Sequence, residues 1–232
     1  MPDPASASRP LPAAVLFDCD GVLIDTEVTS ARVLSERLAR EGVERTPDEI
    51  REVIKGTSLD FVAEEAARLL GHPLPDGWMR DFIDERLVLY RRGVEQIPGA
   101  ADAVRAVLAA GIPIAVVSQG SREKMGVTLP ASGMDTVLGG APIFSGDDVT
   151  RGKPHPDLYL HAAAALGVDP AATVVVEDSP TGATGAHASG ARVLGLATDS
   201  DPEAMRSAGA EVFFDMAEVP WRIGISGTAV PE

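Results

Sequence analysis

The chain is poor in cysteine, in lysine and in long apolar runs. Cys19 is the one cysteine among 232 residues, which excludes an internal disulfide and a thiol cluster for structural zinc. No apolar run is long enough to span a bilayer, and the opening stretch, rich in Pro, Ser and Ala, lacks the apolar core of a secretory signal. The sequence therefore predicts a cytoplasmic protein with no membrane partner.

Basic residues are also scarce. The 20 Lys and Arg against 35 Asp and Glu give a net charge of -15, and a surface this negative repels nucleic acid and anionic lipid. We therefore expect no nucleic-acid partner. The same field opposes a small phosphorylated substrate, so a site for one needs a metal ion or placed cations that create a local positive potential.

The apolar residues that are present, 45% of the chain, can form a sizeable core. Three short apolar runs without polar alternation, each followed by a helical pattern, are typical of strands buried on both faces of a parallel sheet. These runs are 13–17, 112–117 and 173–176, with weaker strand patterns at 191–197 and 210–215 and helical patterns at 100–111, 156–167 and 179–190. The pattern predicts an α/β fold, a Rossmann-like parallel sheet with helices on both faces.

The segment 26–97 differs, because it contains four helical patterns in succession and no convincing strand. One of them begins with Thr46, Pro47 and Glu49, which suit an N-cap, a first helical position and a capping box. An all-helical block after the first strand predicts an inserted cap, and helices packed directly on the sheet are the less favoured alternative. We expect a flexible arm at 1–13, an α/β core domain at 14–25 and 98–222, the helical cap domain at 26–97 and a flexible tail at 223–232.

Polar side chains follow the three strongest strand patterns at the point where each one ends. They are, in chain order, Asp18 and Asp20, then Ser118 and Gln119, then Glu177 and Asp178. Because ligands of an open parallel sheet bind at the carboxyl ends of its strands, we expect these residues to converge. Converging carboxylates repel one another unless some are protonated or a cation lies among them, and Mg²⁺ suits a site built from oxygen atoms.

Other metals and other nucleophiles fit the pattern less well. Zinc would need His or Cys ligands, and the four histidines are expected in surface or packing roles. Cys19 is expected to pack in the core, because flanking carboxylates raise a thiol pKa and strand alternation turns its side chain away from Asp18 and Asp20.

Lysine usage points to one further candidate. Only Lys55, Lys124 and Lys153 among the 20 basic residues are lysines. In a chain that otherwise uses arginine, a lysine indicates a place for a compact, flexible ammonium beside a phosphoryl group or a carboxylate. Lys153, in the stretch GKPHPD, is the candidate, and a solvated loop lysine is the alternative.

Taken together, four stretches resemble the ordered motifs of the haloacid dehalogenase-like phosphohydrolases. They are DCDGVLIDTE from Asp18, the serine of VVSQGS at Ser118, the lysine of GKPHPD at Lys153, and EDS from Glu177. The resemblance runs from about Val15 to Leu196. The helical insert is similar to the small α-helical cap of β-phosphoglucomutase and of many sugar phosphatases in that superfamily.

This resemblance implies roles for the motif residues. Asp18 would attack phosphorus and form an aspartyl-phosphate, and Asp20 would protonate the departing alcohol and then deprotonate water. Ser118 would hydrogen-bond a transferring oxygen, and Lys153 would neutralise that oxygen and the nucleophile.

The resemblance also implies the cofactor and the substrate contacts. Mg²⁺ would be held by Asp18, the Asp20 carbonyl and Asp178, with Glu177 bound either directly or through a neighbouring ligand. Substrate contacts would come from Ser118, Lys153, Gln119, Lys55 and Glu27. Gln119 departs from the asparagine that is usual at its position. For Lys55 the alternative is a helix–helix turn, with Thr57 or Ser58 as an N-cap.

Three activities of the superfamily can be compared with these residues. A dehalogenase is disfavoured, because dehalogenases of this fold lack the counterparts of Asp20 and Asp178. A phosphomutase stays an alternative, although Leu59 stands where the mutase loop has an arginine that grips a second phosphate. The favoured prediction is a Mg-dependent phosphatase of small sugar phosphates or sugar-acid phosphates such as 6-phosphogluconate, acting as a monomer.

Overall fold

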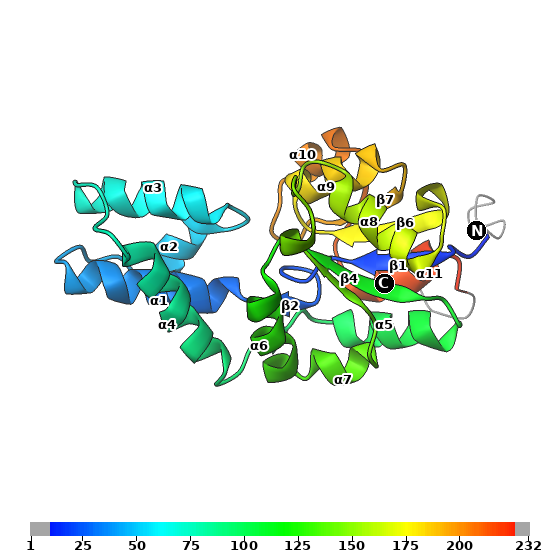
Figure 1. The fold of residues 1–232 in the computed structure, drawn as a ribbon, viewed down its shortest axis with the longest axis horizontal. Helices are drawn as coiled ribbons and strands as arrows, with labels where there is room; N and C mark the ends of the chain where they lie inside the picture. The colour runs from blue at the N-terminus through cyan, green and yellow to red at the C-terminus, as the bar shows by residue number, and fades with distance from the viewer. Residues whose placement is uncertain (1–9, 226–232) are drawn as a thin grey trace.

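The computed structural model describes residues 10–225 and contains a six-stranded parallel sheet with helices on both faces (Figure 1). The strands lie in the order β5-β4-β1-β6-β7-β8. Their bounds are β1 (Ala14–Phe17), β4 (Ile114–Ser118), β5 (Ile143–Ser145), β6 (Thr173–Glu177), β7 (Arg192–Leu196) and β8 (Ala210–Phe213). The predicted α/β class, with a parallel sheet, is confirmed.

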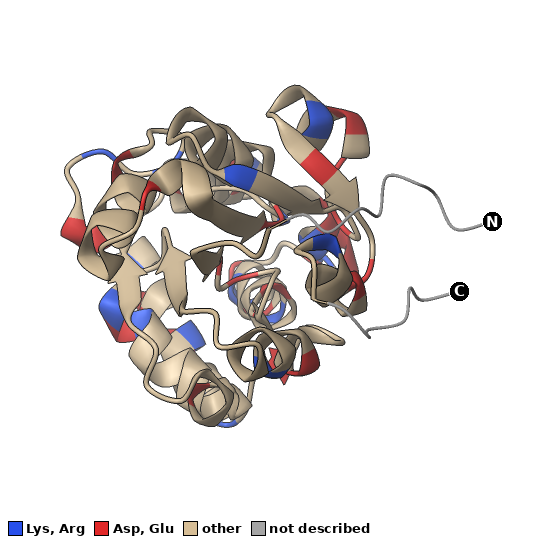
Figure 2. Cartoon of the chain, turned by 90° about the vertical axis from the view of Figure 1, so that its right-hand side faces the viewer, with Lys and Arg blue, Asp and Glu red and all other residues tan. Residues whose placement is uncertain are grey.

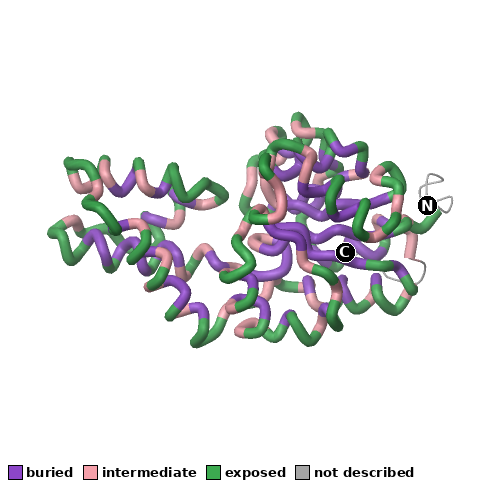
Figure 3. Tube along the Cα trace, viewed as in Figure 1, coloured by how far each residue is buried: buried purple, intermediate pink, exposed green. Residues whose placement is uncertain are grey.

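Helices cover the two faces of this sheet. Those outside the inserted segment are α5 (Ala100–Ala109), α6 (Arg122–Ser132), α7 (Met134–Leu138), α8 (Asp157–Leu166), α9 (Pro180–Ala188), α10 (Pro202–Ser207) and α11 (Val219–Arg222). Val15 and Phe17 of β1 lie in the core that packs on α5, α6, α7 and α11, whereas Leu16 lies in the core on α8, α9 and α10. Side chains alternate along a strand, so an unbroken apolar run can serve both cores, and Figure 3 shows the sheet strands mostly buried.

Some elements have no clear signal in the sequence. Strand β5 has three residues, which is too short to show a period, yet it pairs with β4 at the edge of the sheet. Helix α6 contains Gly126 and Pro130, both weak helix formers, and it begins at an N-cap, Ser121, whose hydroxyl accepts from Lys124 N at 3.2 Å.

The four helical patterns of the inserted segment form four helices that lie to one side of the sheet (Figure 1). They are α1 (Glu27–Arg40), α2 (Pro47–Ile54), α3 (Leu59–Leu70) and α4 (Trp78–Tyr90). Their apolar faces make a separate core that includes Leu34, Ile50 and Phe82. The predicted capping box of α2 is present, with Thr46 N donating to Glu49 Oε2 at 2.8 Å and Glu49 N donating to Thr46 Oγ1 at 3.2 Å.

Two short strands join the helical block to the sheet. The chain leaves through β2 (Ile24–Asp25) and returns through β3 (Glu95–Gln96), and the two pair antiparallel. Strand β3 lies inside the segment where no strand is predicted, because two residues are too few to show a pattern. Both crossings therefore run side by side, and the division into core and cap domains at these points stays a prediction.

The described chain ends close to the predicted arm and tail. Most of the predicted arm and tail, residues 1–9 and 226–232, lies outside the described residues. Ile223 is buried and Ile225 packs against the core, so residues 223–225 belong to the core and not to a flexible tail.

Within residues 10–225 no helix is long and apolar enough to cross a membrane. Figure 2 shows acidic and basic positions spread over the helices and loops around the sheet, with no extended run of basic positions in that view.

Cys19 lies in the core, as its sequence context predicts. Its side chain is fully buried. Burial, together with the negative charges of Asp20 and Asp18, raises the pKa of its thiol well above the usual value. A raised pKa leaves less thiolate at any given pH, and the thiolate is the reactive form.

We therefore predict that iodoacetamide at pH 8 alkylates Cys19 at least about tenfold more slowly in the native protein than in guanidinium chloride. Mass spectrometry of the intact chain measures this, and the unfolded protein is the matched control because the chain has one cysteine. Equal labelling rates in the two states would show that the thiol is accessible and ionised.

Candidate active site

The centre of the sheet brings the predicted residues to one edge. Strands β4, β1 and β6 are neighbours, and the chain direction across the sheet reverses at β1. Asp18 follows β1, Ser118 ends β4 and Glu177 ends β6, so these three side chains share the carboxyl edge. In an open α/β sheet, ligands bind at this same edge, beside the strand where the order reverses.

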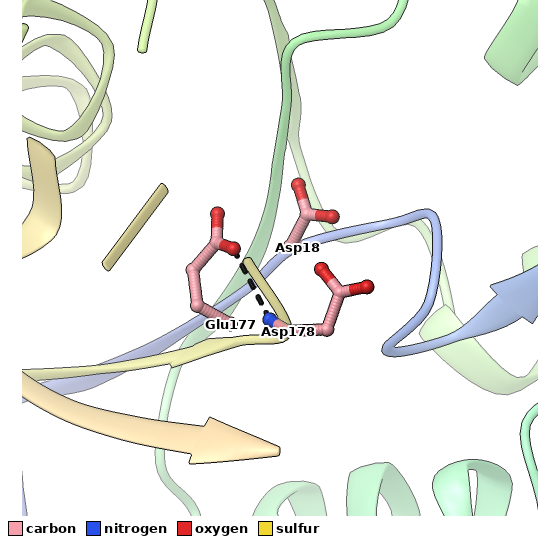
Figure 4. A group of neighbouring side chains, drawn as sticks. All are labelled: Asp18, Glu177 and Asp178. Atoms are coloured by element: carbon pink, nitrogen blue, oxygen red, sulfur yellow. Dashed lines mark hydrogen bonds between the residues drawn. The ribbon is translucent and has the colours of Figure 1, made fainter. Parts of the chain in front are cut away.

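Three carboxylates from two strands lie together there (Figure 4). One ligand atom of each of Asp18, Glu177 and Asp178 lies within 4.8 Å of the others. Burial raises the pKa of Asp18 to about 7, with Lys153 opposing the rise and Glu177 and Asp20 reinforcing it. Burial and the charges of Asp18 and Glu177 also raise the pKa of Asp178 well above its usual range.

The Asp178 carboxylate is the least well partnered of the three acids. In the part of the chain that the structure describes, neither of its oxygens receives a hydrogen bond or an ion pair, although Asp18 and Glu177 lie beside it. A partly buried carboxylate without a partner is costly, and a cation between Asp18 and Asp178 would lower the pKa of both and offset that cost. Because the free donors are all oxygens, the residues fit a hard cation such as Mg²⁺.

Gly21 makes room for this arrangement. Its φ is +78°, and a Cβ at this position would lie 1.8 Å from Asp178 Oδ2. Two separate constraints, the left-handed backbone and the contact with the carboxylate, therefore require glycine directly after Asp20.

Lys153 faces the acids, as its sequence context predicts. Its side chain is 6% exposed, and its ammonium lies 2.6 Å from Asp18 Oδ1, donates to Val117 O at 3.2 Å and pairs with Glu177. Burial opposes its charge, but Asp18 and Glu177 outweigh burial and raise the pKa of Lys153 well above its usual value. It is a fixed cation, not a solvated loop lysine.

Glu177 has its oxygens occupied by the protein. Oε1 accepts from Lys153 and from Tyr159 at 2.7 Å, and Oε2 accepts from Asp178 N at 3.1 Å and from Ser179 N and Oγ at 3.2 and 3.0 Å. Burial opposes its charge, but Lys153, Tyr159 and Ser179 lower its pKa. With five donors on two oxygens, Glu177 holds Lys153 and the start of α9 in place.

Asp20 has a different set of partners. Lys124 Nζ donates to its two oxygens at 2.9 and 2.8 Å, and Thr26 Oγ1 donates to Oδ1 at 2.7 Å. Burial would raise the pKa of Asp20, but Lys124 and Thr26 outweigh burial and lower it. Thus Asp18 and Asp20, two residues apart on one strand end, have pKa values shifted in opposite directions.

Ser118 and Gln119 lie at the tip of β4. Ser118 is buried, its hydroxyl accepts from Gly120 N at 3.0 Å, and it lines a cavity with Asp18 and Lys153. Gln119 lines the same cavity, and its Oε1 accepts from Lys153 N at 2.9 Å. The amide thereby ties the backbone of the Lys153 loop to the end of the strand.

The cavity has a volume of about 220 Å³ and is lined from both the sheet edge and the helical block. Glu27 lines it and accepts from Gly56 N at 2.8 Å. Lys55 is not among its lining residues, and the Lys55 ammonium pairs with Asp199, which follows β7. A substrate contact by Lys55 or Glu27 stays a prediction.

Three neighbours of the acids have no predicted role in the sequence. The scarcity of lysine draws attention to Lys124, but nothing in the sequence pairs it with Asp20, from which it is 104 residues distant. Thr26 and Tyr159 give no signal, because a threonine before a helix and a tyrosine in an apolar helix pattern are ordinary.

With this geometry, comparison with known proteins identifies the family. Residues 12–190 match the haloacid dehalogenase-like hydrolases, and the chain belongs to that family. The resemblance predicted from the four motifs is confirmed, and so is the expectation of an enzyme of the phosphatase type.

Two curated relatives and one solved structure illustrate the similarity. The validoxylamine A 7'-phosphate phosphatase of Streptomyces hygroscopicus subsp. limoneus is 29% identical over 206 residues, 89% of this chain and 95% of that protein. The 6-phosphogluconate phosphatase of Escherichia coli K12 is 30% identical over 213 residues, 89% and 92% of the two chains. A HAD family hydrolase from Deinococcus radiodurans R1, crystallised with bound phosphate and sodium, is 35% identical with a TM-score of 0.78, and the match covers 95% of this chain and 98% of that one.

The contact at Gly21 gives a test of the acidic cluster. We predict that Gly21→Ala lowers phosphatase activity by about 100-fold or more, because the added Cβ displaces Asp178 and groups that act on developing charge need fixed positions. Gly42→Ala is the matched control, since Gly42 has φ +87° but no atom within 4 Å of an added Cβ. If the two variants were equally active, the position of Asp178 would not matter for catalysis.

Proposed function

We propose that this protein is a Mg-dependent phosphatase of small sugar phosphates or sugar-acid phosphates, acting through an aspartyl-phosphate on Asp18. The observation that carries the proposal is the environment of Asp18. Its carboxylate is 2.6 Å from the Lys153 ammonium, lies beside the unpartnered Asp178 and opens on a cavity shared with the helical block.

In the first step an Asp18 oxygen attacks phosphorus and the bond from phosphorus to the sugar oxygen breaks. Lys124 and Thr26 lower the pKa of Asp20, so Asp20 takes up a proton as the phosphate ester binds and gives that proton to the departing oxygen, and the sugar leaves as a neutral alcohol. In the second step a water oxygen attacks phosphorus, Asp20 takes the water proton, and the Asp18 carboxylate and phosphate are released. Neither step consumes an oxidant or a reductant.

The residues around Asp18 support the charge changes of both steps. Lys153 lies close enough to neutralise Asp18 and an oxygen of the transferring group, and Ser118 offers a hydroxyl at the same wall of the cavity. Because phosphoryl transfer depends mainly on position and on stabilised charge, fixed donors of this kind account for much of the expected rate.

Asp18, Asp178 and the main-chain carbonyl of Asp20 would hold Mg²⁺, and Glu177 would act through Lys153 and the backbone because its oxygens are occupied. Bound Mg²⁺ supplies positive charge for the phosphoryl oxygens and for Asp18. In its absence, burial holds the pKa of Asp18 at about 7, too high for a fully ionised nucleophile at neutral pH.

The relatives support the substrate class. Two of them are named as phosphatases of validoxylamine A 7'-phosphate and of 6-phosphogluconate, and the Deinococcus radiodurans protein was crystallised with bound phosphate. A phosphomutase is the alternative, and Leu59 argues against it. This leucine lines the cavity, and a leucine cannot hold an anion.

Replacement of Asp18 tests the nucleophile. We predict that Asp18→Asn lowers phosphate release from p-nitrophenyl phosphate by about 10⁴-fold or more, because an amide is a poor nucleophile. Asp135→Asn is the control, since Asp135 is exposed on α7, and it should keep full activity. Turnover by Asp18→Asn near the control rate would require another nucleophile.

Removal of the metal tests the cofactor separately. We predict that EDTA abolishes turnover by the wild-type protein and that added Mg²⁺ restores it, because the acidic cluster then regains its cation. Full activity in EDTA would contradict the proposed cofactor while leaving Asp18 as the nucleophile.

A further inference from the structure

Arg86 on α4 is a buried cation that the proposed reaction does not use. It is 9% exposed and lines the cavity that also contains Asp18 and Asp20. The guanidinium stacks on Phe82, with its central carbon 4.6 Å from the ring centroid, so it is held by the core of the helical block.

The partners of Arg86 are few for a buried charge. A guanidinium has five N–H donors, and the contacts found for this one are Nη1 to Ser30 Oγ at 3.4 Å and the Phe82 ring. Its Nε has no hydrogen-bond partner among residues 10–225, and no carboxylate of those residues forms an ion pair with it.

Arg37 on α1 is a second buried arginine of the helical block and can be compared with Arg86. It is 8% exposed and also stacks on an aromatic ring, Trp78, but its Nη1 pairs with Glu85 at 2.9 Å. The Nε of Arg37, like that of Arg86, has no hydrogen-bond partner among residues 10–225, so the two arginines differ in the ion pair. Since a buried charge is costly unless it is paired, the charge of Arg37 is offset by Glu85, whereas no carboxylate of those residues offsets that of Arg86.

The positive charge of Lys124 adds to the cost of an unpaired Arg86. Lys124 lies near enough to Arg86 for the two positive charges to oppose each other, and the Lys124 ammonium is already bound to both oxygens of Asp20. The helical block therefore contributes to the cavity a guanidinium with no ion pair among residues 10–225, while the transferred phosphoryl group would bind at the sheet edge with Asp18, Ser118 and Lys153.

We propose that Arg86 binds a second anionic group of the substrate, at the end away from the phosphoryl group that is transferred. The preferred substrates are then phosphate monoesters that also carry a carboxylate or another phosphate, and Arg86 is a specificity-determining residue. This inference rests on the proposed phosphatase function and narrows its substrate class. A guanidinium suits either anion, since its fork of donors matches carboxylate and phosphate alike.

Three compounds that differ only at one end of a six-carbon chain test this. They are glucitol 6-phosphate, with a neutral CH₂OH, 6-phosphogluconate, with a carboxylate, and glucitol 1,6-bisphosphate, with a second phosphate. For the wild-type protein we expect kcat/KM to be about 10- to 100-fold higher for at least one of the two charged compounds, the range for a charge-assisted hydrogen bond. Which of them is preferred identifies the anion.

Arg86→Gln should remove that preference and leave kcat/KM for glucitol 6-phosphate within about threefold of wild type. Arg86→Lys should restore part of it. Arg80→Gln is the matched control, because Arg80 is exposed on the same helix, and it should behave as wild type. Thermal unfolding of each variant shows that the helical block is intact.

Two results would overturn the inference. One is a wild-type protein that does not distinguish the neutral compound from either charged one. The other is an Arg86→Gln protein, folded as wild type, that loses activity equally on all three, since Arg86 would then act on the transferred phosphoryl group or on the fold.

If the proposed phosphatase function is wrong, binding measurements still test the role of Arg86. If the wild-type protein hydrolyses none of the three compounds, calorimetric binding of the same compounds to the wild-type and Arg86→Gln proteins replaces turnover as the readout. Selective binding of a charged compound that Arg86→Gln loses supports the role of Arg86 even then, and equal binding of all three contradicts it.

Discussion

The structure depends on holding like charges close together at the end of a buried strand. Asp18, Glu177 and Asp178 would repel one another if each were ionised and alone. Lys153 pairs with two of them, and backbone and hydroxyl donors complete the shell of Glu177. Asp178 has no hydrogen-bond or ion-pair partner among residues 10–225, and the proposed cation would supply one. The pKa values of the isolated chain, raised at Asp18 and Asp178, express the same deficit.

The helical block completes a site that the sheet begins. The sheet edge supplies the reacting groups, and the block supplies the opposite wall of the cavity, with Leu59, Phe82 and Arg86 in its lining. Its contacts with the sheet side are polar, such as Lys55 with Asp199 and Arg51 with Asp25 at 3.3 Å. Ion pairs that keep access to water contribute little to stability, so these pairs do little to fix the helical block against the sheet side. Under the proposed function, chemistry and substrate choice are therefore divided between two sets of elements.

Sequence reasoning succeeds where a short-range rule fixes geometry. Asp18 and Asp178 follow buried strands, and parallel strands bring their carboxyl ends to one edge, so their convergence can be predicted. It fails where packing between helices decides. Lys124 reaches Asp20 only because α6 lies against that edge, and Lys55 meets Asp199 across 144 residues of sequence. The unpaired state of Arg86 has no local signal either, since any partner would come from another helix. Strand β5 is missed for a simpler reason, its length of three residues.

We infer that Asp18 and Asp178 share a divalent cation, and calorimetric titration with Mg²⁺ measures whether they do. We expect one site in the wild-type protein and an affinity at least about tenfold weaker in Asp178→Asn, with Asp102→Asn, exposed on α5, unchanged. Equal Mg²⁺ affinity in the wild-type and Asp178→Asn proteins would contradict the account.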